Sequence, residues 1–468
     1  MNHIKFGTDG WRAIIAKEYT TENVARVAWA TALWLLKNNT KPTVVVGHDC
    51  RFAGPMFAEV TTKVLTHHGI AVKLAKGFVS TPMVSLGVVK EKAQLGVVIT
   101  ASHNPPEYNG YKLKGYFGGP LQPDLVQEIE DIIPESTSFD WESIKMEDLE
   151  EQGLLSYIDL ESMYVKHVED NFDLAAIKNC GLKFAYDAMY GAGQNAMKRI
   201  LPETTLMHCE DNPSFMGQAP EPIHKNLIPF SNMIKDAGNI NCGLATDGDA
   251  DRIGLYNSTG EFVDSHHIIM LLIKYLVEVK KYDGKVVAAF SVTPRLKKLC
   301  DYFGLTLQVT KIGFKYVSGI MITEDVLLGG EESGGIAIKG HIPERDGIWM
   351  GLVVWEYMAK SGKTLEQLIS EVYEIVGDFA FNRNDLHLEE SVKQDVIKKC
   401  KSGDFKSFGD YQVKNIETID GFKFHFDNNE WVMIRPSGTE PVLRVYAESS
   451  TLDGANAILE ATKATVLA

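Results

Sequence analysis

The sequence predicts an α/β protein with three related α/β domains and a smaller C-terminal α+β domain around a central active-site cleft. The first observation is an alternation of short apolar runs with longer helical patterns near the start of the 468-residue chain. Strands are expected at 43–46, 72–75 and 96–99, and helices at 24–37 and 57–68. Such alternation is typical of a sheet whose strands are joined by helical crossovers.

The second observation is that this pattern recurs twice. Strands are expected at 183–186 and 242–245, and again at 286–290, 307–309 and 326–328. A chain of 468 residues suggests three domains or a little more, at roughly 150 residues per domain.

The third observation is that a late strand in each block leads into a loop of small and polar residues. The three segments read GVVITASHNP, CGLATDGDADR and VLLGGEESGG. Open α/β sheets bind ligands at the carboxyl ends of their strands. Three similar domains around one cleft would therefore bring these loops together.

The pattern of expected helices and strands changes in the last part of the chain. A helix at 364–376 is expected to end at Gly377, and short strands follow at 422–426, 431–434 and 443–447. This block is predicted to be a small α+β domain. The expected domains are 1–150, 151–258, 259–377 and 378–468, with polar linkers at 134–153 and 257–260.

Composition narrows the functional class. The net charge of −15 disfavours a nucleic-acid partner, but it allows small anionic substrates, because a basic pocket can lie within an acidic protein. The six cysteines form no CxxC pair and indicate reduced thiols in a cytoplasmic protein. Residues 1–12 lack the apolar core of a signal peptide. The most apolar stretch, 268–279, carries Lys274 and is too short to span a bilayer, so we expect a buried helix and no membrane partner. For the oligomeric state, a monomer and a homodimer are both expected possibilities.

The first candidate site is the serine loop at 100–106, which reads TASHNPP. Ser102 follows a buried strand, lies beside His103, and is stiffened by Pro105 and Pro106. A nucleophilic serine needs to be exposed, to lie in a fixed turn, and to have its alkoxide or phosphate charge stabilised. The alternative is an ordinary turn rich in Ser, Asn and Pro.

The second candidate site is the metal loop, in which Asp247, Asp249 and Asp251 alternate with small residues. Three carboxylates at this spacing can direct oxygens at one hard cation, and Mg²⁺ prefers oxygen ligands. The preceding CGLAT run indicates the end of a buried strand, which favours a metal site over a solvated acidic turn. The loop lacks the length and the later Glu of an EF-hand.

Two further loops have ligand-binding character. In the sugar loop at 329–335, glycine-flanked Glu331 and Ser333 offer an acceptor and a donor where the backbone permits close approach, although a flexible turn is an equal alternative. The loop at 435–439 combines an arginine fork, two hydroxyls and a glycine, which suits a phosphate better than a plain hairpin. Its candidate residues are Arg435, Ser437, Gly438 and Thr439.

Two familiar patterns are present but weak. Residues 362–364 resemble the end of a Walker A loop, but Tyr357 stands where the first glycine is required. The run GAGQNA at 191–196 fits a loose dinucleotide pattern, and we favour a tight strand-to-helix turn there. The histidine pairs His67–His68 and His266–His267 are interpreted as surface or helix-face residues.

With these four loops in order, the sequence resembles the α-D-phosphohexomutase superfamily, which includes phosphoglucomutases and phosphomannomutases. The similarity runs through FGTDGWR, GHDCR, TASHNPPEYNGYK, DGDADR, GEESGG and RPSGTEP, and it covers essentially the whole chain. The resemblance implies three α/β domains and a fourth around a deep cleft. It also implies an enzyme that interconverts hexose 1-phosphate and hexose 6-phosphate.

The resemblance assigns a role to each motif. Ser102 would carry the phosphoryl group, and glucose 1,6-bisphosphate would be the intermediate and the activator. The implied Mg²⁺ ligands are the Ser102 phosphate, Asp247, Asp249 and Asp251. The other implied catalytic residues are His103, Lys112, Arg12 and Arg252. Hexose phosphate would be bound by Arg51, Lys311, Gly313, Glu331, Ser333, His341 and Arg345, and the phosphate not reacting by Arg435, Ser437, Gly438 and Thr439.

The choice of sugar depends on loop similarity. KIGFKYV and GHIPERDG resemble phosphoglucomutases, although Arg345 replaces the usual Lys. Phosphomannomutase relatives often have a His where this chain has Gly335, and His341 is either a substitute base or an ordinary loop histidine. Glu332 stands where the GEQSGH motif of phosphoglucosamine mutases has Gln. We therefore favour glucose phosphates, with phosphomannomutase or dual specificity as the alternative.

Two other functions are weighed against a mutase. In a phosphatase of the haloacid-dehalogenase type, Asp247 would be the nucleophile and Asp249 its partner. A non-catalytic sugar-phosphate sensor would need neither an intact serine nor three aspartates. The phosphatase leaves the serine loop and the 435–439 loop unexplained, and the intact Ser102 and the three aspartates argue against the sensor.

Overall fold

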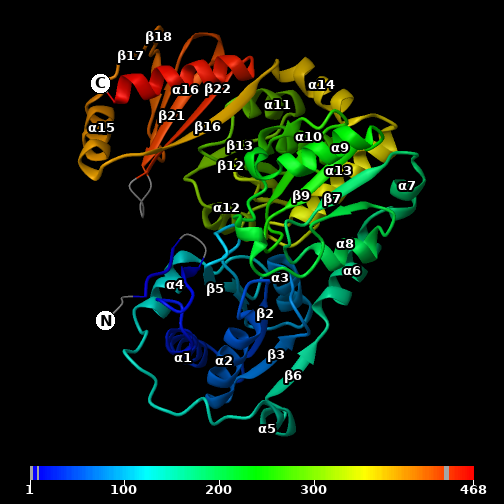
Figure 1. Cartoon of the computed structure of the whole chain (residues 1–468), viewed down its shortest axis with the longest axis vertical. Coiled ribbons are helices and arrows are strands. Elements are labelled where there is room, and N and C mark those ends of the chain that lie inside the picture. The colour runs from blue at the N-terminus through cyan, green and yellow to red at the C-terminus, as the bar shows by residue number, and fades with distance from the viewer. Residues whose placement is uncertain (1–3, 8–9, 437–441, 468) are drawn as a thin grey trace. The chain divides into compact units, whose positions relative to one another are not determined.

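The protein is described here by a computed structural model, in which the chain forms two compact units (Figure 1). The described residues are 4–7, 10–436 and 442–467. The first unit contains residues 1–287 and 313–368, and the second contains residues 288–312 and 369–468.

The first sheet has six strands in the order β1-β5-β4-β2-β3-β6. Strands β4, β2, β3 and β6 run parallel, and β5 and β1 add an antiparallel edge. The bounds are β1 Trp11–Ile14, β2 Thr43–His48, β3 Ala71–Ala75, β4 Leu95–Ile99, β5 Tyr108–Gly115 and β6 Leu155–Ile158. The three strands expected in this block are confirmed.

Helices cover both faces of this sheet. Val44, Val46 and Val97 belong to the core that includes residues of α1 (Thr21–Asn38) and α2 (Gly54–His67). The alternate positions Gly47 and Gly96 face the helix α3 (Thr81–Lys90). A Cβ at either glycine would lie 2.7 or 2.6 Å from a valine methyl of α3, so glycine permits this close packing.

The second sheet has the order β11-β10-β9-β7-β8. Strands β8, β7 and β9 are parallel, β10 is antiparallel to β9, and β11 is antiparallel to β10. Its strands are β7 Phe184–Asp187, β8 Thr205–Met207, β9 Cys242–Thr246, β10 Ile253–Tyr256 and β11 Phe262–Val263. The helices that precede or accompany it are α4 Pro123–Glu130, α5 Met146–Glu151, α6 Leu160–Asn171, α7 Leu174–Asn179, α8 Gln194–Ile200 and α9 Ile228–Ala237.

A third sheet has the order β13-β12-β14-β15. Its strands are β12 Lys285–Ala289, β13 Leu307–Thr310, β14 Val326–Gly330 and β15 Ile336–Ile338. The helices of this segment are α10 Ser265–Glu278, α11 Leu296–Phe303, α12 Phe314–Met321, α13 Gly347–Ser361 and α14 Leu365–Val376.

The second unit contains a five-stranded antiparallel sheet in the order β16-β22-β21-β20-β19. Helix α16 packs on β22 and β16 (Figure 1), which confirms the small α+β domain. The bounds are β16 Ala380–His387, α15 Glu390–Ser402, β17 Ser407–Phe408, β18 Tyr411–Gln412, β19 Asn415–Glu417, β20 Phe422–His425, β21 Trp431–Pro436, β22 Val442–Ser449 and α16 Leu452–Val466.

Two local expectations need correction. The segment 134–153 is not wholly irregular, because it forms α5, whose Leu149 is buried in the core of the first sheet. His266 and His267 are buried in the first turn of α10, where Asp264 caps the helix, so they are helix residues, as one interpretation expected, but not surface residues. The rest of α10 is the predicted buried apolar helix. Among the described residues, we find no helix that is both long and apolar enough to cross a membrane.

Candidate active site

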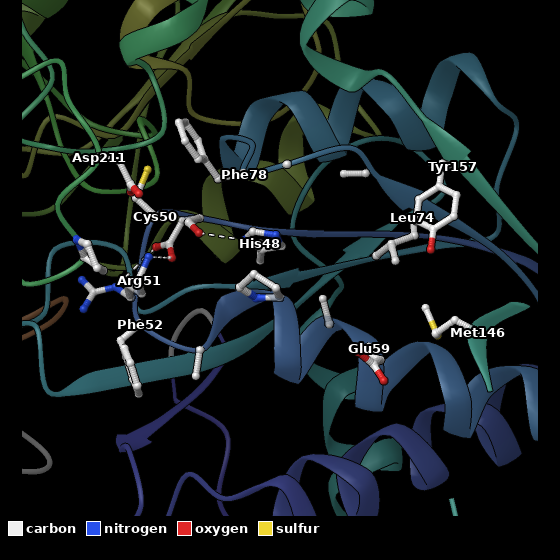
Figure 2. A pocket seen from close by; sticks show the side chains of 17 residues that line it. His48, Cys50, Arg51, Phe52, Glu59, Leu74, Phe78, Met146, Tyr157 and Asp211 are labelled. Carbon is white, nitrogen blue, oxygen red and sulfur yellow. Dashed lines mark hydrogen bonds and ion pairs between the residues drawn. The ribbon is translucent and has the colours of Figure 1, made fainter. Parts of the chain in front are cut away.

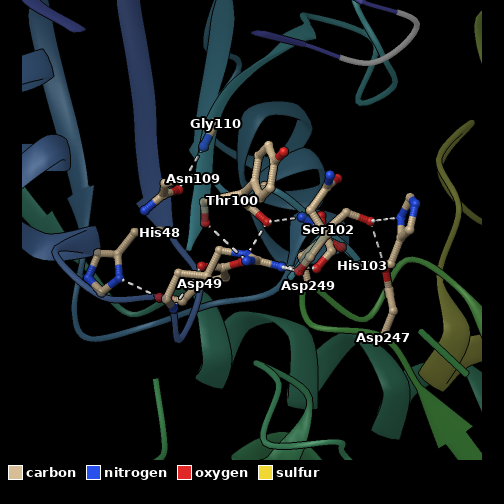
Figure 3. Close-up of polar contacts among 12 residues, drawn as sticks. His48, Asp49, Thr100, Ser102, His103, Asn109, Gly110, Asp247 and Asp249 are labelled. Carbon is tan, nitrogen blue, oxygen red and sulfur yellow. Dashed lines mark hydrogen bonds and ion pairs between the residues drawn. The ribbon is translucent and has the colours of Figure 1, made fainter. Parts of the chain in front are cut away.

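The fold of the first unit brings the serine loop and the metal loop into contact (Figure 3). Ser102 follows β4 and Asp247 follows β9, so both loops leave the carboxyl ends of buried strands as predicted. The Ser102 hydroxyl donates a hydrogen bond of 2.7 Å to Asp247 Oδ2. His103 Nδ1 lies 3.3 Å from the same oxygen of Ser102. The Ser102 hydroxyl therefore stands directly against the acidic cluster.

The backbone of Ser102 is held in an uncommon conformation. Its φ of 53° lies in the left-handed region, which non-glycine residues seldom adopt. The Ser102 N–H donates to Thr100 Oγ1 at 2.8 Å, and the residue is 1% exposed. Conformations of this kind persist when surrounding contacts over-determine them, and they gather at functional sites.

Arg51 supports the serine loop instead of facing a ligand. Its guanidinium donates to the carbonyls of Ser102 and Asn104 at 2.6 Å each. It also donates to the carbonyls of Pro105 at 2.8 Å and Tyr108 at 3.0 Å. Because both terminal nitrogens are committed and the side chain is fully buried, the geometry is contrary to the predicted role of Arg51 in substrate binding.

The turn that carries Arg51 also borders a cavity of about 570 Å³. Figure 2 shows Leu74, Met146 and Tyr157 at one end and Asp211 at the other. Of the predicted site residues that the structure describes, Arg51 alone lines this cavity. No residue of the serine loop or the metal loop is among those that line it.

The three aspartates of the metal loop can present oxygens to one ion. One ligand atom from each of Asp247, Asp249 and Asp251 lies within 4.8 Å of the others, and all three residues are buried. Asp247 Oδ1 is fixed by the N–H groups of Asp251 and Arg252 at 2.9 and 3.0 Å. Asp249 Oδ1 and Asp251 Oδ1 are buried without a hydrogen-bond partner in the described part of the chain. Unpartnered buried carboxylate oxygens fit a hard cation.

Buried cations offset the charge of this cluster. Lys112 Nζ lies 2.8 Å from Asp249 Oδ2 and 3.1 Å from Asp251 Oδ2, and Arg345 lies 2.8 Å from Asp251 Oδ2. Burial, together with the neighbouring carboxylates, raises the pKa of Asp247 well above its usual range. Burial acts in the same direction on Asp249, but the ion pair with Lys112 outweighs it and lowers the pKa of that carboxyl.

The remaining catalytic candidates lie around the serine loop. Burial and the surrounding arginine and lysine charges lower the pKa of His103 well below its usual value, so its ring is neutral near pH 7. Arg12 donates to Asn104 Oδ1 at 2.6 Å. Arg252 follows the metal loop, lies 3.5 Å from Glu221, and has a buried Nε without a partner among the described residues.

The sugar loop follows β14 and is fixed by its glycines. Glu331 Oε1 accepts a hydrogen bond of 2.8 Å from the N–H of Gly313, which joins two residues predicted to bind substrate. Gly334 has a φ of +88°, and a Cβ there would lie 2.5 Å from the Ile253 carbonyl. Ser333, partly exposed, lies between these fixed points. Burial raises the pKa of Glu331 to about 7, although Arg345 opposes the shift.

His341 does not belong to the sugar loop. Its Nε2 lies 3.0 Å from Asp346 Oδ2, its Nδ1 lies 3.3 Å from His167 Nε2, and its ring stacks on Trp349 at 3.8 Å. Its side chain is fully buried, and Tyr164 also donates to Asp346. Packing of this kind is contrary to a substitute base and fits a structural histidine.

The predicted phosphate residues belong to the second unit. Arg435 is the penultimate residue of β21 and pairs with Asp420 Oδ2 at 3.3 Å. The N–H of Ile312, next to the predicted Lys311, donates to the same Asp420 oxygen at 2.9 Å. Asp420 thus links the segment at Lys311 and Ile312 to Arg435. Ser437, Gly438 and Thr439 lie outside the described residues.

The structure adds supporting residues that were not among the candidate site residues. Asp49 and Thr100 hold the serine loop, and Thr81 donates to Asp249 Oδ2 at 2.6 Å. Asp49 had a usable signal, since it is a carboxylate at the carboxyl end of a predicted strand. Thr81 carries no such signal, because only the tertiary structure brings the start of α3 to the metal loop.

The glycine run at 191–196 is a turn between β7 and α8, as favoured. A Cβ at Gly191 would lie 2.7 Å from the Asp247 carbonyl, and one at Gly193 would lie 2.1 Å from the Tyr186 hydroxyl. The small residues therefore pack behind the metal loop, which explains the pattern without a dinucleotide.

Four models of one protein family match the chain in order. They are described as phosphoglucomutase/phosphomannomutase alpha/beta/alpha domain I, domain II, domain III and C-terminal domain, at residues 3–139, 162–260, 264–376 and 389–464. A Methanosphaera stadtmanae protein named probable phosphoglucosamine mutase is 31% identical over 458 residues, covering 97% of this chain and 96% of its own. The chain belongs to the phosphoglucomutase/phosphomannomutase family.

Two further relatives bear on the family's range. A Thermococcus kodakarensis protein named phosphoglucomutase/phosphomannomutase is 30% identical and covers 97% of this chain and 96% of its own. A solved structure from Thermus thermophilus, of a protein proposed to be a phosphomannomutase, has a TM-score of 0.87, 32% identity and full coverage of both chains. Membership of the phosphohexomutase superfamily confirms the predicted fold class and enzyme class, whereas the names of the relatives differ in their sugar.

Gly248 of the metal loop gives a test of the contact between the two loops. A Cβ at this position would lie 2.6 Å from the Ser102 carbonyl and 3.0 Å from Pro220. We expect Gly248→Ala to lower kcat on the order of 10-fold and the free energy of unfolding by about 1–3 kcal/mol. Gly319→Ala, where the Cβ meets only the end of the Gln122 side chain, is the control for steady-state kinetics and urea unfolding. Equal effects of the two substitutions would contradict the prediction.

The raised pKa of Glu331 predicts a pH-dependent difference in stability. The folded protein holds this proton up to about pH 7, so stability is lost as pH rises from the ordinary value of 4.5 through 7. We expect Glu331→Gln to match the wild type near pH 4 and to exceed its free energy of unfolding by up to about 3 kcal/mol at pH 8. Urea unfolding at both pH values measures this difference in the free energy of unfolding. A difference that is the same at pH 4 and pH 8 would contradict the prediction.

Proposed function

We propose that the protein is a phosphohexomutase that interconverts hexose 1-phosphate and hexose 6-phosphate, with Ser102 carrying the phosphoryl group. The observation that supports this most directly is the hydrogen bond of 2.7 Å from the Ser102 hydroxyl to Asp247, a member of the buried carboxylate cluster. Membership of the family supports the reaction class.

Mg²⁺ is the metal that fits the cluster best, because all the candidate ligands are oxygens. Asp247, Asp249, Asp251 and the Ser102 phosphate would hold it. When bound, the ion supplies positive charge that stabilises the transferring phosphoryl group. Arg252, with an unpartnered buried Nε among the described contacts, is placed to add a second positive charge.

The proposed transfer balances around Ser102. The bond between phosphorus and Ser102 Oγ breaks while phosphorus bonds to a free hydroxyl of the hexose monophosphate. That hydroxyl gives up a proton and Ser102 Oγ gains one, and Asp247 Oδ2, which already accepts the serine hydrogen bond, is placed to pass it. The bisphosphate then turns over, and Ser102 takes the other phosphoryl group. Glucose 1,6-bisphosphate would activate by restoring phosphoserine.

Two contacts are proposed for the rest of the substrate. Glu331 would accept a sugar hydroxyl, with Ser333 as the adjacent donor. Arg435, oriented by Asp420, would hold the phosphate that is not reacting, as a planar fork suited to phosphate oxygens. A contact that depends on phosphate charge and not on the shape of the sugar can bind either phosphate of the bisphosphate.

Glucose phosphates are our first choice of substrate, supported by the GFK and HIPERDG segments. Mannose phosphates or dual specificity are the alternative. Glucosamine phosphates are a further candidate, because a 31% identical relative is named for that activity. Here Gly335 and Glu332 differ from the GEQSGH pattern, which favours glucose.

A coupled assay tests the proposal. Glucose, mannose and glucosamine 1-phosphates are supplied with Mg²⁺ and a trace of glucose 1,6-bisphosphate, and free phosphate is followed in parallel. We expect isomerisation of the glucose ester without phosphate release, and loss of the reaction after chelation of Mg²⁺. Activity only on another sugar would correct the substrate and keep the mechanism. Phosphate release without isomerisation indicates a phosphatase, and no turnover indicates a sensor.

A further inference from the structure

The hydroxyl of Thr100 lies between the backbone of the nucleophile and a buried carboxylate (Figure 3). Thr100 Oγ1 donates to Asp49 Oδ2 at 2.5 Å and accepts from the N–H of Ser102 at 2.8 Å. Asp49 is 1% exposed and Thr100 is fully buried. A hydroxyl has one proton to donate, so the carboxylate on one side fixes Thr100 as the acceptor for Ser102 on the other.

Asp49 is itself fixed by the turn after β2. Its Oδ1 accepts from the N–H of Arg51 at 2.9 Å, and its Oδ2 lies 3.3 Å from Arg51 Nε. The same arginine donates to the Ser102 carbonyl at 2.6 Å. The residue Ser102 is therefore held at its N–H through Thr100 and at its carbonyl by Arg51, and both supports originate in one turn.

We propose that Asp49 and Thr100 are positioning residues that keep Ser102 in its left-handed conformation and aim its Oγ at Asp247. This inference rests on the proposed function and deepens it. Ser102 at φ 53° needs such support, because a non-glycine residue relaxes out of this region when its contacts are lost. Without the Thr100 hydroxyl, the Ser102 N–H and one Asp49 oxygen both lose a partner in a buried place.

The proposal predicts a specific pattern of kinetics. Thr100→Val has nearly the same shape and lacks the hydroxyl. We expect its kcat to fall on the order of 10- to 100-fold, because a displacement of about 1 Å at a nucleophile is enough for such a loss. KM should change by less than about twofold, since both side chains are buried within the protein. Thr100→Ser retains the hydroxyl and should recover most of kcat, and Asp49→Asn should fall between the two.

A matched control separates positioning from general loss of stability. Thr61 in α2 is also fully buried, and its Oγ1 donates to the Phe57 carbonyl of its own helix at 2.9 Å. Thr61→Val removes the same atom away from the serine loop and should leave kcat within about twofold of the wild type. The midpoint of urea unfolding is measured for every variant. The rate of Ser102 phosphorylation by glucose 1,6-bisphosphate, followed by intact mass, should fall in Thr100→Val.

The outcomes distinguish this inference from the proposed function. An active wild type with Thr100→Val impaired in kcat, Thr100→Ser restored and Thr61→Val normal supports the inference. An active wild type with Thr100→Val unimpaired, or with Thr100→Ser as impaired as Thr100→Val, overturns the inference and leaves the proposed function standing. An equal loss in Thr61→Val also overturns it. A wild type with no mutase activity overturns both.

Discussion

Replacing Ser102 by alanine should abolish phosphoryl transfer, with a loss in kcat on the order of 10⁴-fold or more, because the variant has no atom to carry the phosphoryl group. The fold should survive, since the substitution removes a single oxygen from the loop. The coupled assay measures the loss. Intact mass after incubation with glucose 1,6-bisphosphate should show phosphate on the wild type and none on Ser102→Ala.

Ser231→Ala is the control for loss of a buried hydroxyl. Ser231 is 1% exposed, like Ser102, and its Oγ donates to the Gly260 carbonyl outside the candidate site. Its kcat should stay close to that of the wild type. A Ser102→Ala protein that still acquires phosphate would indicate an aspartyl phosphoenzyme of the dehalogenase type, with Asp247 as the acceptor. Retained mutase activity would remove Ser102 from the mechanism.

Replacing Lys112 by methionine should cause the largest loss of stability among single substitutions proposed here. Lys112 Nζ lies within hydrogen-bonding distance of Asp249 and Asp251, and all three side chains are fully buried. Removing one partner of a buried ion pair leaves an uncompensated charge, which costs about 3–5 kcal/mol. We expect the first transition in urea unfolding to shift by that amount, with mutase activity lost as the carboxylates rearrange.

Lys63→Met provides the matched control for the lost ammonium group. Lys63 pairs with Glu59 one helical turn away at 2.7 Å, and Glu59 is 46% exposed, so water screens the pair. Its removal should change the free energy of unfolding by about 0.5 kcal/mol or less. If Lys112→Met unfolded at the same urea concentration as Lys63→Met, the acidic cluster would not depend on Lys112 for its charge balance.

The local structure of the serine loop and the metal loop could be predicted because the residues of each motif themselves favour that structure. The buried strands β4 and β9 are short apolar runs, and the chain leaves each of them through small and polar residues. Asp247, Asp249 and Asp251 have the spacing for one cation before any packing is considered, and the structure places their oxygens together. The family resemblance added the order of the loops and the expected chemistry.

Arg51 and His341 show where such reasoning stops. Both are polar residues in loops near a motif, and a sequence does not tell a ligand-binding arginine from one whose N–H groups are used by carbonyls. For Arg51 the deciding partners are the carbonyls of Ser102 to Tyr108, more than 50 residues away in sequence. His341 is committed by His167, 174 residues away. Non-local pairing decides these roles.

The sequence by itself determined the α/β class, the small C-terminal domain, the position of the serine loop and the aspartate triad, because strand periodicity and local spacing are properties of short segments. Only the tertiary structure decided which side chains support the site and which face it. Asp49, Thr81 and Lys112 reach the serine and metal loops from other strands and helices. Their contribution depends on distances of about 3 Å between residues far apart in the chain, which only burial and packing of the whole domain can set.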